Sequence, residues 1–430
     1  MSSSSATPTR RAAGSTAFKR INRAMLFGGF ATFALLYCVQ PLMPLLAAEF
    51  ALTPAQSSWS LSISTGALAL SLLLSSAVSE RLGRKPLMVA AIATAAATTV
   101  LCAFATSFGQ LLVLRAALGI ALGGMPAIAM AYLGEEIEAE SLGLSMGLYI
   151  GGSAFGGMAG RLLTSVLADH LSWRVALGVL GAAGLVVACE FWRSLPASRN
   201  FAPGEPGWDR LAGGLRQHCS DRGLLLLFLV AFMLAGSFVG MYNFIGYRLL
   251  ATPYALSQSA VGALSLLYLI GMFSSVWAGR LADRLGRRGV LWIMLAAMVA
   301  GLLLTLASSL LSIVPGIALF TFGFFASHSV ASSWVGRRAR TPKALASALY
   351  LFCYYLGSSV IGSLCGVMWQ WRGWPAVVLA LAGLLGVALL LALRLRGVLP
   401  LPAPLMPAGL GSGLRYHAAA DERAGPKLAG

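Results

Sequence analysis

The chain has 430 residues, of which 58% are hydrophobic and only 10% are charged. Soluble domains carry a charge on about a quarter of their residues, so this composition excludes an ordinary soluble domain and predicts a protein of the lipid bilayer. The formal net charge of +17 does not indicate a nucleic-acid partner, because the basic residues gather in short segments between apolar runs.

Apolar runs follow one another along the chain, and each is long enough for a membrane-spanning helix, which needs about 20 residues. The twelve runs are 24–48, 57–79, 86–106, 110–133, 145–168, 174–194, 224–247, 258–279, 289–309, 311–334, 344–368 and 375–395. Backbone groups in hydrocarbon must be satisfied within their own segment, and no run alternates like a strand of a membrane barrel. The sequence therefore predicts an all-α integral membrane protein with twelve transmembrane helices.

Basic residues lie almost entirely on one side of the predicted bundle. If the helices alternate in direction, 26 of the 31 Lys and Arg residues fall on the side that holds both tails. Basic loops stay in the cytoplasm, so we expect both termini to be cytoplasmic. Arginine outnumbers lysine 27 to 4, which suggests a GC-rich bacterial genome and hence the bacterial inner (plasma) membrane.

One long hydrophilic stretch, residues 195–223, divides the helices into two groups of six. It reads as a cytoplasmic linker with room for a short surface helix. The predicted segments are a cytoplasmic N-tail at 1–23, a six-helix half at 24–194, the linker at 195–223, a second six-helix half at 224–396 and a cytoplasmic C-tail at 397–430.

An internal repeat supports this division. Glu80 and Asp283 occupy equivalent positions, each between the second and third helix of its half. In the fifth helix of each half, "YIGGSAFGGMAGR" (149–161) aligns without gaps on "YLGSSVIGSLCGV" (355–367). The matched residues are Tyr149, Gly151, Ser153, Gly156 and Gly160 with Tyr355, Gly357, Ser359, Gly362 and Gly366. The two halves are therefore expected to run parallel as two copies of one unit.

Two such halves with basic loops between their second and third helices resemble the major facilitator superfamily of secondary transporters over roughly residues 20–400. The loop motif of that family, Gly-x-x-x-Asp-Arg-x-Gly-Arg-Arg, is met by Gly279, Asp283, Arg284, Gly286, Arg287 and Arg288. In the first half Arg81, Gly83 and Arg84 match, whereas Ser76 and Glu80 replace the glycine and the aspartate.

Three further stretches carry the resemblance. Arg115 and Gly119 match a motif of the fourth helix. The glycine-rich fifth helix resembles the antiporter motif, although Gly157 stands in place of its proline and Arg161 in place of its last glycine. Together, "LYCVQPLMPLLAAEF" (36–50) and "GGMAGRLL" (156–163) resemble the acriflavine-sensitivity branch of the drug:proton antiporters.

The resemblance implies that the charged loops that contain Glu80 and Asp283 act as gates. Asp283 and Glu80 would each pair with an arginine and with a helix N-terminus, and so hold the cytoplasmic side shut while the cavity faces outward. This tie would break during inward opening. The alternative is that the loops act only as topology anchors.

Two arginines fall inside predicted helices, where charge is costly and usually functional. Arg115 and Arg161 lack basic counterparts in the second half, so we expect a coupling or substrate role for both. The alternatives are a helix tie through backbone carbonyls for Arg115 and snorkelling to the outer surface for Arg161. His328 could carry a coupling proton or serve as a hydrogen-bonded packing residue. No run holds a deep carboxylate, which favours neutral or anionic cargo.

The resemblance also implies which residues line the transport cavity, because the first and fourth helices of each half surround it. The candidate lining residues are Tyr37, Gln40, Tyr242, Asn243 and Tyr247, with Tyr149 and Tyr354 nearby. Aromatic rings with few fixed charges suit an amphipathic small molecule.

No clustered catalytic set lies within the runs and no phosphate-binding loop is present, so we predict neither an enzyme nor an ATP-driven pump. The six cysteines show no Cys-x-x-Cys spacing, and we expect no metal and no cofactor. The predicted function is a monomeric, proton-coupled exporter of small organic molecules or drugs. The alternative is a proton-coupled uptake symporter for a small organic anion, with Arg115 and Arg161 binding its carboxylate.

Overall fold

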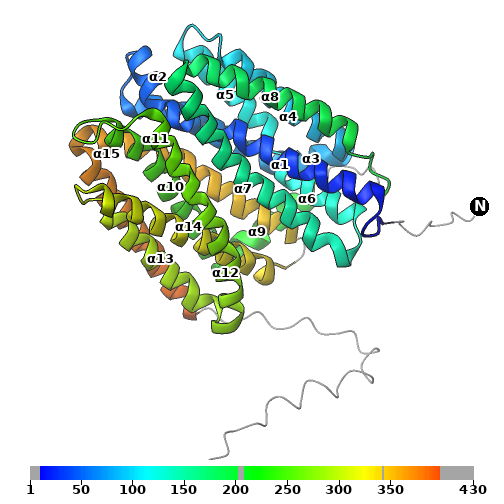
Figure 1. The fold of residues 1–430 in the computed structure, drawn as a ribbon. Coiled ribbons are helices and arrows are strands. Elements are labelled where there is room, and N and C mark those ends of the chain that lie inside the picture. The colour runs from blue at the N-terminus through cyan, green and yellow to red at the C-terminus, as the bar shows by residue number, and fades with distance from the viewer. Residues whose placement is uncertain (1–9, 202–207, 341–342, 398–430) are drawn as a thin grey trace, which may run out of the picture. The chain divides into compact units, whose positions relative to one another are not determined.

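The computed structural model describes residues 10–201, 208–340 and 343–397, without the side chains of 76–81, 208–211 and 396. Within these ranges every regular element is a helix (Figure 1). This confirms the all-α prediction. Of the predicted tails at 1–23 and 397–430, residues 1–9 and 398–430 lie outside the described residues.

The first half contains eight α-helices and one 3₁₀ turn. They are α1 (Thr16–Tyr37), η1 (Gln40–Leu42), α2 (Met43–Glu49), α3 (Pro54–Leu82), α4 (Arg84–Cys102), α5 (Phe108–Leu122), α6 (Met125–Glu136), α7 (Ala139–His170) and α8 (Trp173–Ser194). Serine side chains accept a hydrogen bond from the first turn of α1, α5 and α8. Each of these caps satisfies a backbone amide that the helix leaves without a partner.

The second half follows a short linker helix, α9 (Trp208–Ser220). Its elements are α10 (Arg222–Leu250), α11 (Gln258–Ala263), η2 (Leu264–Leu267), α12 (Tyr268–Leu285), α13 (Arg287–Leu304), α14 (Leu310–Arg338), α15 (Lys343–Arg394) and η3 (Leu395–Gly397). The backbone of α15 leaves helical geometry at Arg372 and at Gly373, where φ is +62°. This element is therefore two consecutive helices joined by a bend.

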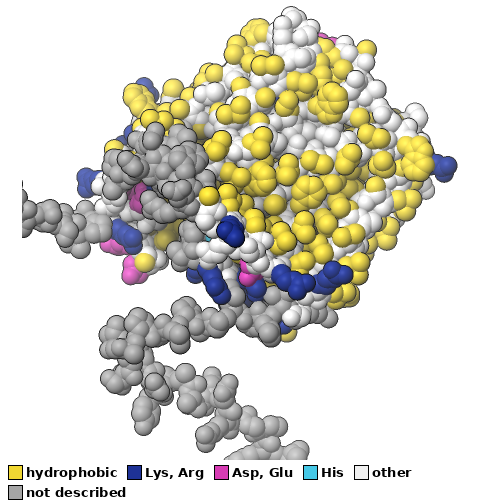
Figure 2. Space-filling view, turned by 180° about the vertical axis from the view of Figure 1, so that it is seen from behind, with side chains coloured by type: hydrophobic (Ala, Val, Ile, Leu, Met, Phe, Trp, Pro, Cys, Tyr) yellow, Lys and Arg dark blue, Asp and Glu magenta, His cyan; other side chains and the backbone are white. Residues whose placement is uncertain are grey.

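Ten described helical segments are long and apolar enough to cross a membrane. One of them, Lys343–Arg394, contains the bend and so supplies two spans. The 32-residue α7 lies beside α1 and supplies another (Figure 1). The described chain thus accommodates the predicted twelve helices. Large apolar side chains such as Leu311 and Phe104 face outward, and Figure 2 shows a broad hydrophobic surface with Lys and Arg mainly at its margins.

Two of the predicted runs, the first and the fourth, are broken in the structure. The first helix begins at Thr16 rather than at 24, because Ser15 caps it. It ends at Tyr37, and Pro41 and Pro44 break the remainder of the predicted run into η1 and α2. The predicted fourth run, 110–133, is likewise interrupted between α5 and α6. Proline lacks the amide that a continuous helix needs.

Glycines bring the first and fifth spans of each half into backbone contact. A Cβ at Gly156 in α7 would lie 2.1 Å from the carbonyl oxygen of Phe30 in α1. A Cβ at Gly357 in α15 would lie 2.0 Å from the carbonyl oxygen of Phe232 in α10. The same pair of helices is therefore packed backbone against backbone in both halves, although the repeat matches Gly156 with Gly362 and Gly357 with Gly151.

The linker is held at both of its ends. Glu136, fully buried at the end of α6, accepts hydrogen bonds from the backbone amides of Arg199 (2.6 Å) and Asn200 (3.0 Å). Asp221, the N-cap of α10, receives two hydrogen bonds from Arg338 at the end of α14, 2.6 and 2.9 Å long. The linker thereby joins the end of α6 to the end of α14.

We expect the variant Gly156→Ala to lower the unfolding temperature of the detergent-purified protein, because overpacking costs about 1–3 kcal/mol. The matched control is Gly151→Ala in the same helix, where an added Cβ meets nothing within 4 Å. This control should be as stable as the parent or more stable, since alanine favours a helix. Equal unfolding temperatures for the two variants would contradict the packing account.

Asp221→Asn should also destabilise the protein, in a pH-dependent way. Burial alone would raise the pKa of Asp221, but Arg338 and the Leu224 amide bind the charged carboxyl and hold its pKa below the usual value. The carboxylate therefore stabilises the folded state above the unfolded-state pKa, and this contribution disappears as the pH falls through the lowered pKa.

At pH 7 we expect the Asp221→Asn substitution to cost about 1–3 kcal/mol, measured by thermal unfolding. The difference from the parent should shrink below about pH 4. Asp283→Asn removes two ion pairs of a carboxylate that is 58% exposed and serves as the control, with an expected change of about 0–1 kcal/mol. A difference for Asp221→Asn that persists unchanged in acid would argue against the ion pair.

Candidate functional site

Because successive spans run in opposite directions, the helix connections fall at two ends of the bundle. We call the end that holds the start of α1, the linker and the end of α15 the tail end. The other we call the far end; it holds the connections α2–α3, α4–α5, α7–α8, α10–α11 and α13–α14.

Six hydrogen bonds join the two halves among the described residues, and each lies in the part of its helix nearer the far end. They are Gln40–Asn243, Ser57–Tyr247, Pro41–Gln258, Asp169–Ser259, Met158–Ser265 and Ser62–Ser359. Gly262 also packs against Ser165. In this conformation the two halves therefore meet closely at the far end.

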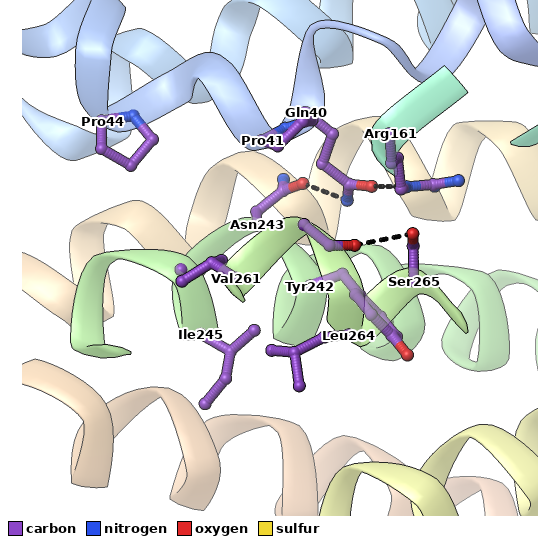
Figure 3. Close-up of a pocket in the computed structure, with 12 residues that line it drawn as sticks. Gln40, Pro41, Pro44, Arg161, Tyr242, Asn243, Ile245, Val261, Leu264 and Ser265 are labelled. Atoms are coloured by element: carbon purple, nitrogen blue, oxygen red, sulfur yellow. Dashed lines mark hydrogen bonds between the residues drawn. The ribbon is translucent and has the colours of Figure 1, made fainter. Parts of the chain in front are cut away.

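The centre of this contact is a buried chain of polar side chains (Figure 3). Arg161 in α7 is only 5% exposed, and its Nε donates to Oε1 of Gln40 at 2.5 Å. The Nε2 of the same Gln40 amide donates to Oδ1 of Asn243 in α10 at 2.7 Å. Gln40 is the first residue of η1 and is followed by Pro41, so this turn after α1 presents the amide toward the second half. One amide group thus connects a cation in the first half to a side chain in the second.

Aromatic rings enclose the Arg161 guanidinium. Its carbon lies 4.2 Å from the ring centre of Tyr37 and 4.9 Å from that of Tyr268. One terminal nitrogen donates to the backbone oxygen of Gly157 at 2.6 Å. Cation–π contacts of this kind contribute about 0.5–2 kcal/mol each when desolvated. They partly offset the cost of burying the charge.

A small cavity of about 30 Å³ adjoins this cluster. Its polar lining comes from Gln40, Arg161, Tyr242, Asn243 and Ser265. A site of this size has room for about one or two waters and is too small for an organic molecule. The far end is therefore closed around the polar chain.

Arg115 has a different environment, inside the first half. It is 1% exposed, and its three kinds of nitrogen donate to the backbone oxygens of Ser60 (3.1 Å), Leu35 (3.0 Å) and Leu36 (2.5 Å). The last carbonyls of a helix have no partner within it, and Leu35 and Leu36 belong to the last turn of α1. This geometry matches the alternative of a helix tie through backbone carbonyls.

The second half contributes a stack of aromatic side chains. Phe238 lies 5.5 Å from Tyr268 and 3.7 Å from Phe324, measured between ring centres. Phe324 in turn stacks on His328 at 6.1 Å, and Nδ1 of His328 lies 3.0 Å from the Tyr350 hydroxyl. The predicted residue His328 is therefore connected to the surroundings of Arg161 through a continuous series of rings.

The candidate lining residues are brought together only in part. Tyr37, Gln40 and Asn243 belong to the Arg161 cluster, and Tyr242 lines the adjoining cavity while its hydroxyl bonds to Thr321 at 2.8 Å. Tyr247 lies nearer the far end, and its hydroxyl is 2.6 Å from that of Ser57. Tyr247 is thus part of the contact that closes the far end.

The loop motif of the second half forms a tie at the tail end. Asp283 at the end of α12 pairs with Arg287 at 2.7 Å and with Arg337 of α14 at 3.3 Å. Gly286 makes the turn with φ of +84°. Such a backbone conformation favours glycine. The arginines that flank this turn, Arg284 and Arg288, and the helical Gly279 lie on the same loop and helix end.

In the first half, Gly83 makes the equivalent turn with φ of +85°, and Arg84 pairs with Glu135 at 2.8 Å. This tie connects the start of α4 to the end of α6. The side chains of Glu80 and Arg81 lie outside the described residues, so their gating role stays a prediction.

Three important residues were not singled out by the sequence. Tyr268 encloses Arg161, Ser265 joins the second half to Met158, and Glu136 holds the linker. Their partners lie far away along the chain, and nothing local to these residues marks them. Only the repeat could have pointed to the region of Tyr268, because this residue begins α12 within the second span of its half.

Comparison with known proteins identifies the family. The model of the Major Facilitator Superfamily matches residues 25–362. The inner membrane transport protein YnfM of Escherichia coli is 49% identical over 382 residues, which cover 89% of this chain and 92% of that protein. The uncharacterized MFS-type transporter YybF of Bacillus subtilis is 46% identical over 386 residues, covering 90% and 95%.

A solved structure agrees with this assignment at the level of the fold. The nucleoside transporter NupG superposes with a TM-score of 0.73 at 16% identity, covering 87% of this chain and 99% of that one. The fold, the closed contact between two six-helix halves and the relatives lead to one conclusion. The chain belongs to the major facilitator superfamily and is a secondary membrane transporter, not an enzyme.

Proposed function

We propose that the protein is a proton-coupled exporter of small organic molecules that works by alternating access. It acts as a monomer in the bacterial inner membrane, with both termini in the cytoplasm. The observation that supports this proposal best is the polar contact between the halves at the far end, centred on Gln40, Asn243 and Arg161.

The contact at the far end has the strength expected of a gate. Each hydrogen bond between the halves contributes only about 0.5–1.5 kcal/mol net, and six such bonds can be broken and replaced by contacts elsewhere. The packing inside each half is of another kind, because glycines place backbone against backbone. Motion should therefore occur between the halves, as rigid bodies.

The Asp283 tie suits a second gate at the tail end. In its ion pair with Arg337, the Asp283 side chain is 58% exposed and the Arg337 side chain is 66% exposed. Exposed ion pairs contribute about 0–1 kcal/mol, so this pair can be exchanged during the cycle at little cost. The pairs with Arg287 and Arg337 lie within the second half while the far end is closed, so we infer that Asp283, and Glu80 by the repeat, exchanges its partners and closes the tail end when the far end opens.

His328 is the best candidate for the coupling proton. Imidazole is the side chain that ordinarily titrates nearest to neutral pH, and His328 lies in α14 against aromatic rings of the second half. It also has a hydrogen-bonding partner, Tyr350, and it faces the aromatic stack that a cargo would contact.

Export is the proposed direction, following the resemblance of the first and fifth spans to drug:proton antiporters. The second candidate is uptake of a small organic anion together with protons. It is favoured by Arg161, a buried cation that makes no ion pair with any described residue. The sign of proton movement distinguishes the two directions.

The test is proton movement in proteoliposomes that contain a pH dye, while organic cations, neutral drugs and organic acids are added. An added substrate should evoke a proton flux in the parent. His328→Gln should lose this flux and keep exchange of labelled substrate, because it removes the proton carrier alone. His170→Gln, at the exposed end of α7, is the control and should behave like the parent. Full proton flux in His328→Gln would refute its role.

Asp283→Asn should slow transport strongly in the same vesicles, because the tail end would close poorly. Its unfolding temperature should change little, since the lost ion pair is exposed. Normal transport rates in this variant would show that the loop is a topology anchor only.

A further inference from the structure

We propose that Arg161 is the binding site for a carboxylate on an aromatic cargo, and that this carboxylate displaces Gln40 from Arg161 and so releases the contact between Gln40 and Asn243. The proposal deepens the function given above, because it names the chemical class of the cargo and the way in which cargo opens the far end.

The first argument is charge. Arg161 is only 5% exposed, and within the described chain no carboxylate pairs with it. An unpaired buried charge is costly, and in membrane spans such residues mark substrate and ion pathways. The other fully buried arginine, Arg115, has three backbone carbonyls as partners. Arg161 therefore remains the cation of the interior that an anion would satisfy best.

The second argument is the weakness of the present partners. The Nε of Arg161 is bound by the neutral amide oxygen of Gln40, and one terminal nitrogen by the Gly157 carbonyl. Neither partner carries a negative charge, whereas a carboxylate adds Coulombic attraction and fits the guanidinium fork in two-point contact. A carboxylate that reaches Arg161 should displace the amide oxygen of Gln40.

A third observation places an unused hydrogen-bonding group at the same point. The hydroxyl of Tyr268 is buried and has no partner among the described residues, and its ring lies against the Arg161 guanidinium. Buried hydroxyls are nearly always satisfied in folded proteins. A carboxylate bound to Arg161 would provide an acceptor close to this hydroxyl.

The shape of the cargo follows from the rings beyond Tyr268. Phe238 contacts Tyr268, Tyr242 and Phe324, so an aromatic surface extends from Arg161 toward His328. Aromatic side chains favour offset or edge-on contact with another ring. The geometry points to a small molecule with an aromatic ring and one carboxylate.

The link to opening lies in the single amide of Gln40. Its oxygen accepts from Arg161 and its nitrogen donates to Asn243, so both bonds depend on one side-chain orientation. A carboxylate that takes over Arg161 leaves the amide oxygen without its partner and frees the side chain to turn. Cargo binding would thereby weaken the closed far end, which is a differential effect on the two conformations.

The experiment measures binding to the full-length, detergent-purified protein by isothermal titration and by thermal unfolding. The probes are benzoate, benzamide and benzylamine, which share one ring and differ in charge. Benzoate should bind and raise the unfolding temperature, whereas benzamide and benzylamine should not. Arg161→Gln should weaken benzoate binding by about ten- to a hundredfold, the loss expected for hydrogen bonds to a charged group.

Two further variants make the test independent of misfolding. Arg161→Lys keeps the charge and should retain a preference for benzoate over benzamide at reduced affinity. Arg248→Gln removes another arginine that contacts aromatic rings near the far end and should leave benzoate binding unchanged.

Gln40→Leu gives the sharpest result. If Gln40 competes with the cargo for Arg161, its removal should strengthen benzoate binding about fivefold, the value of one ordinary hydrogen bond. Weaker binding in Gln40→Leu would show that Gln40 holds the cargo, and would overturn the displacement.

Benzoate binding that survives in Arg161→Gln, or equal binding of benzoate and benzamide, would overturn the anion site. These results do not depend on proton coupling. Benzoate binding at Arg161 without any proton-coupled flux would contradict the proposed function and leave the site standing. Proton-coupled transport of neutral compounds without carboxylate binding would contradict the carboxylate site and leave the proposed function standing.

Discussion

The amide of Gln40 is the contact on which the closed far end depends. It lies between Arg161 of the first half and Asn243 of the second, buried among aromatic rings. A buried polar group without a hydrogen-bonding partner destabilises a membrane protein. One of its partners, Arg161, belongs to the first half and the other, Asn243, to the second. This amide can therefore bind both partners only while the two halves lie together.

The rest of the first half holds Gln40 in place. Arg115 binds the last carbonyls of α1, and Pro41 prevents the helix from continuing through the glutamine. The glycines of α7 press this helix against α1, so Arg161 and Gln40 approach each other from two rigidly packed elements. In this account Arg115 is a positioning residue, and Arg161 is the residue that meets cargo.

Much of the fold could be predicted from the sequence, because long apolar runs and an internal glycine repeat are local signals. The turns at Gly83 and Gly286 also follow from local motifs. The partners of Arg161 could not be predicted, since Gln40 is 121 positions away in the chain and a helix pattern does not fix which faces of distant helices meet. For the same reason the contact of Tyr247 with Ser57 could not be predicted.

The most direct test is the distance between spin labels at His170 and Ala260, which are exposed positions at the far ends of the two halves, in a chain without other reactive cysteines. The parent should give a narrow, short distance distribution. Gln40→Leu, or the parent with benzoate, should add a longer distance as the far end opens. An unchanged distribution in both cases would contradict the claim that the Gln40 amide holds the two halves together.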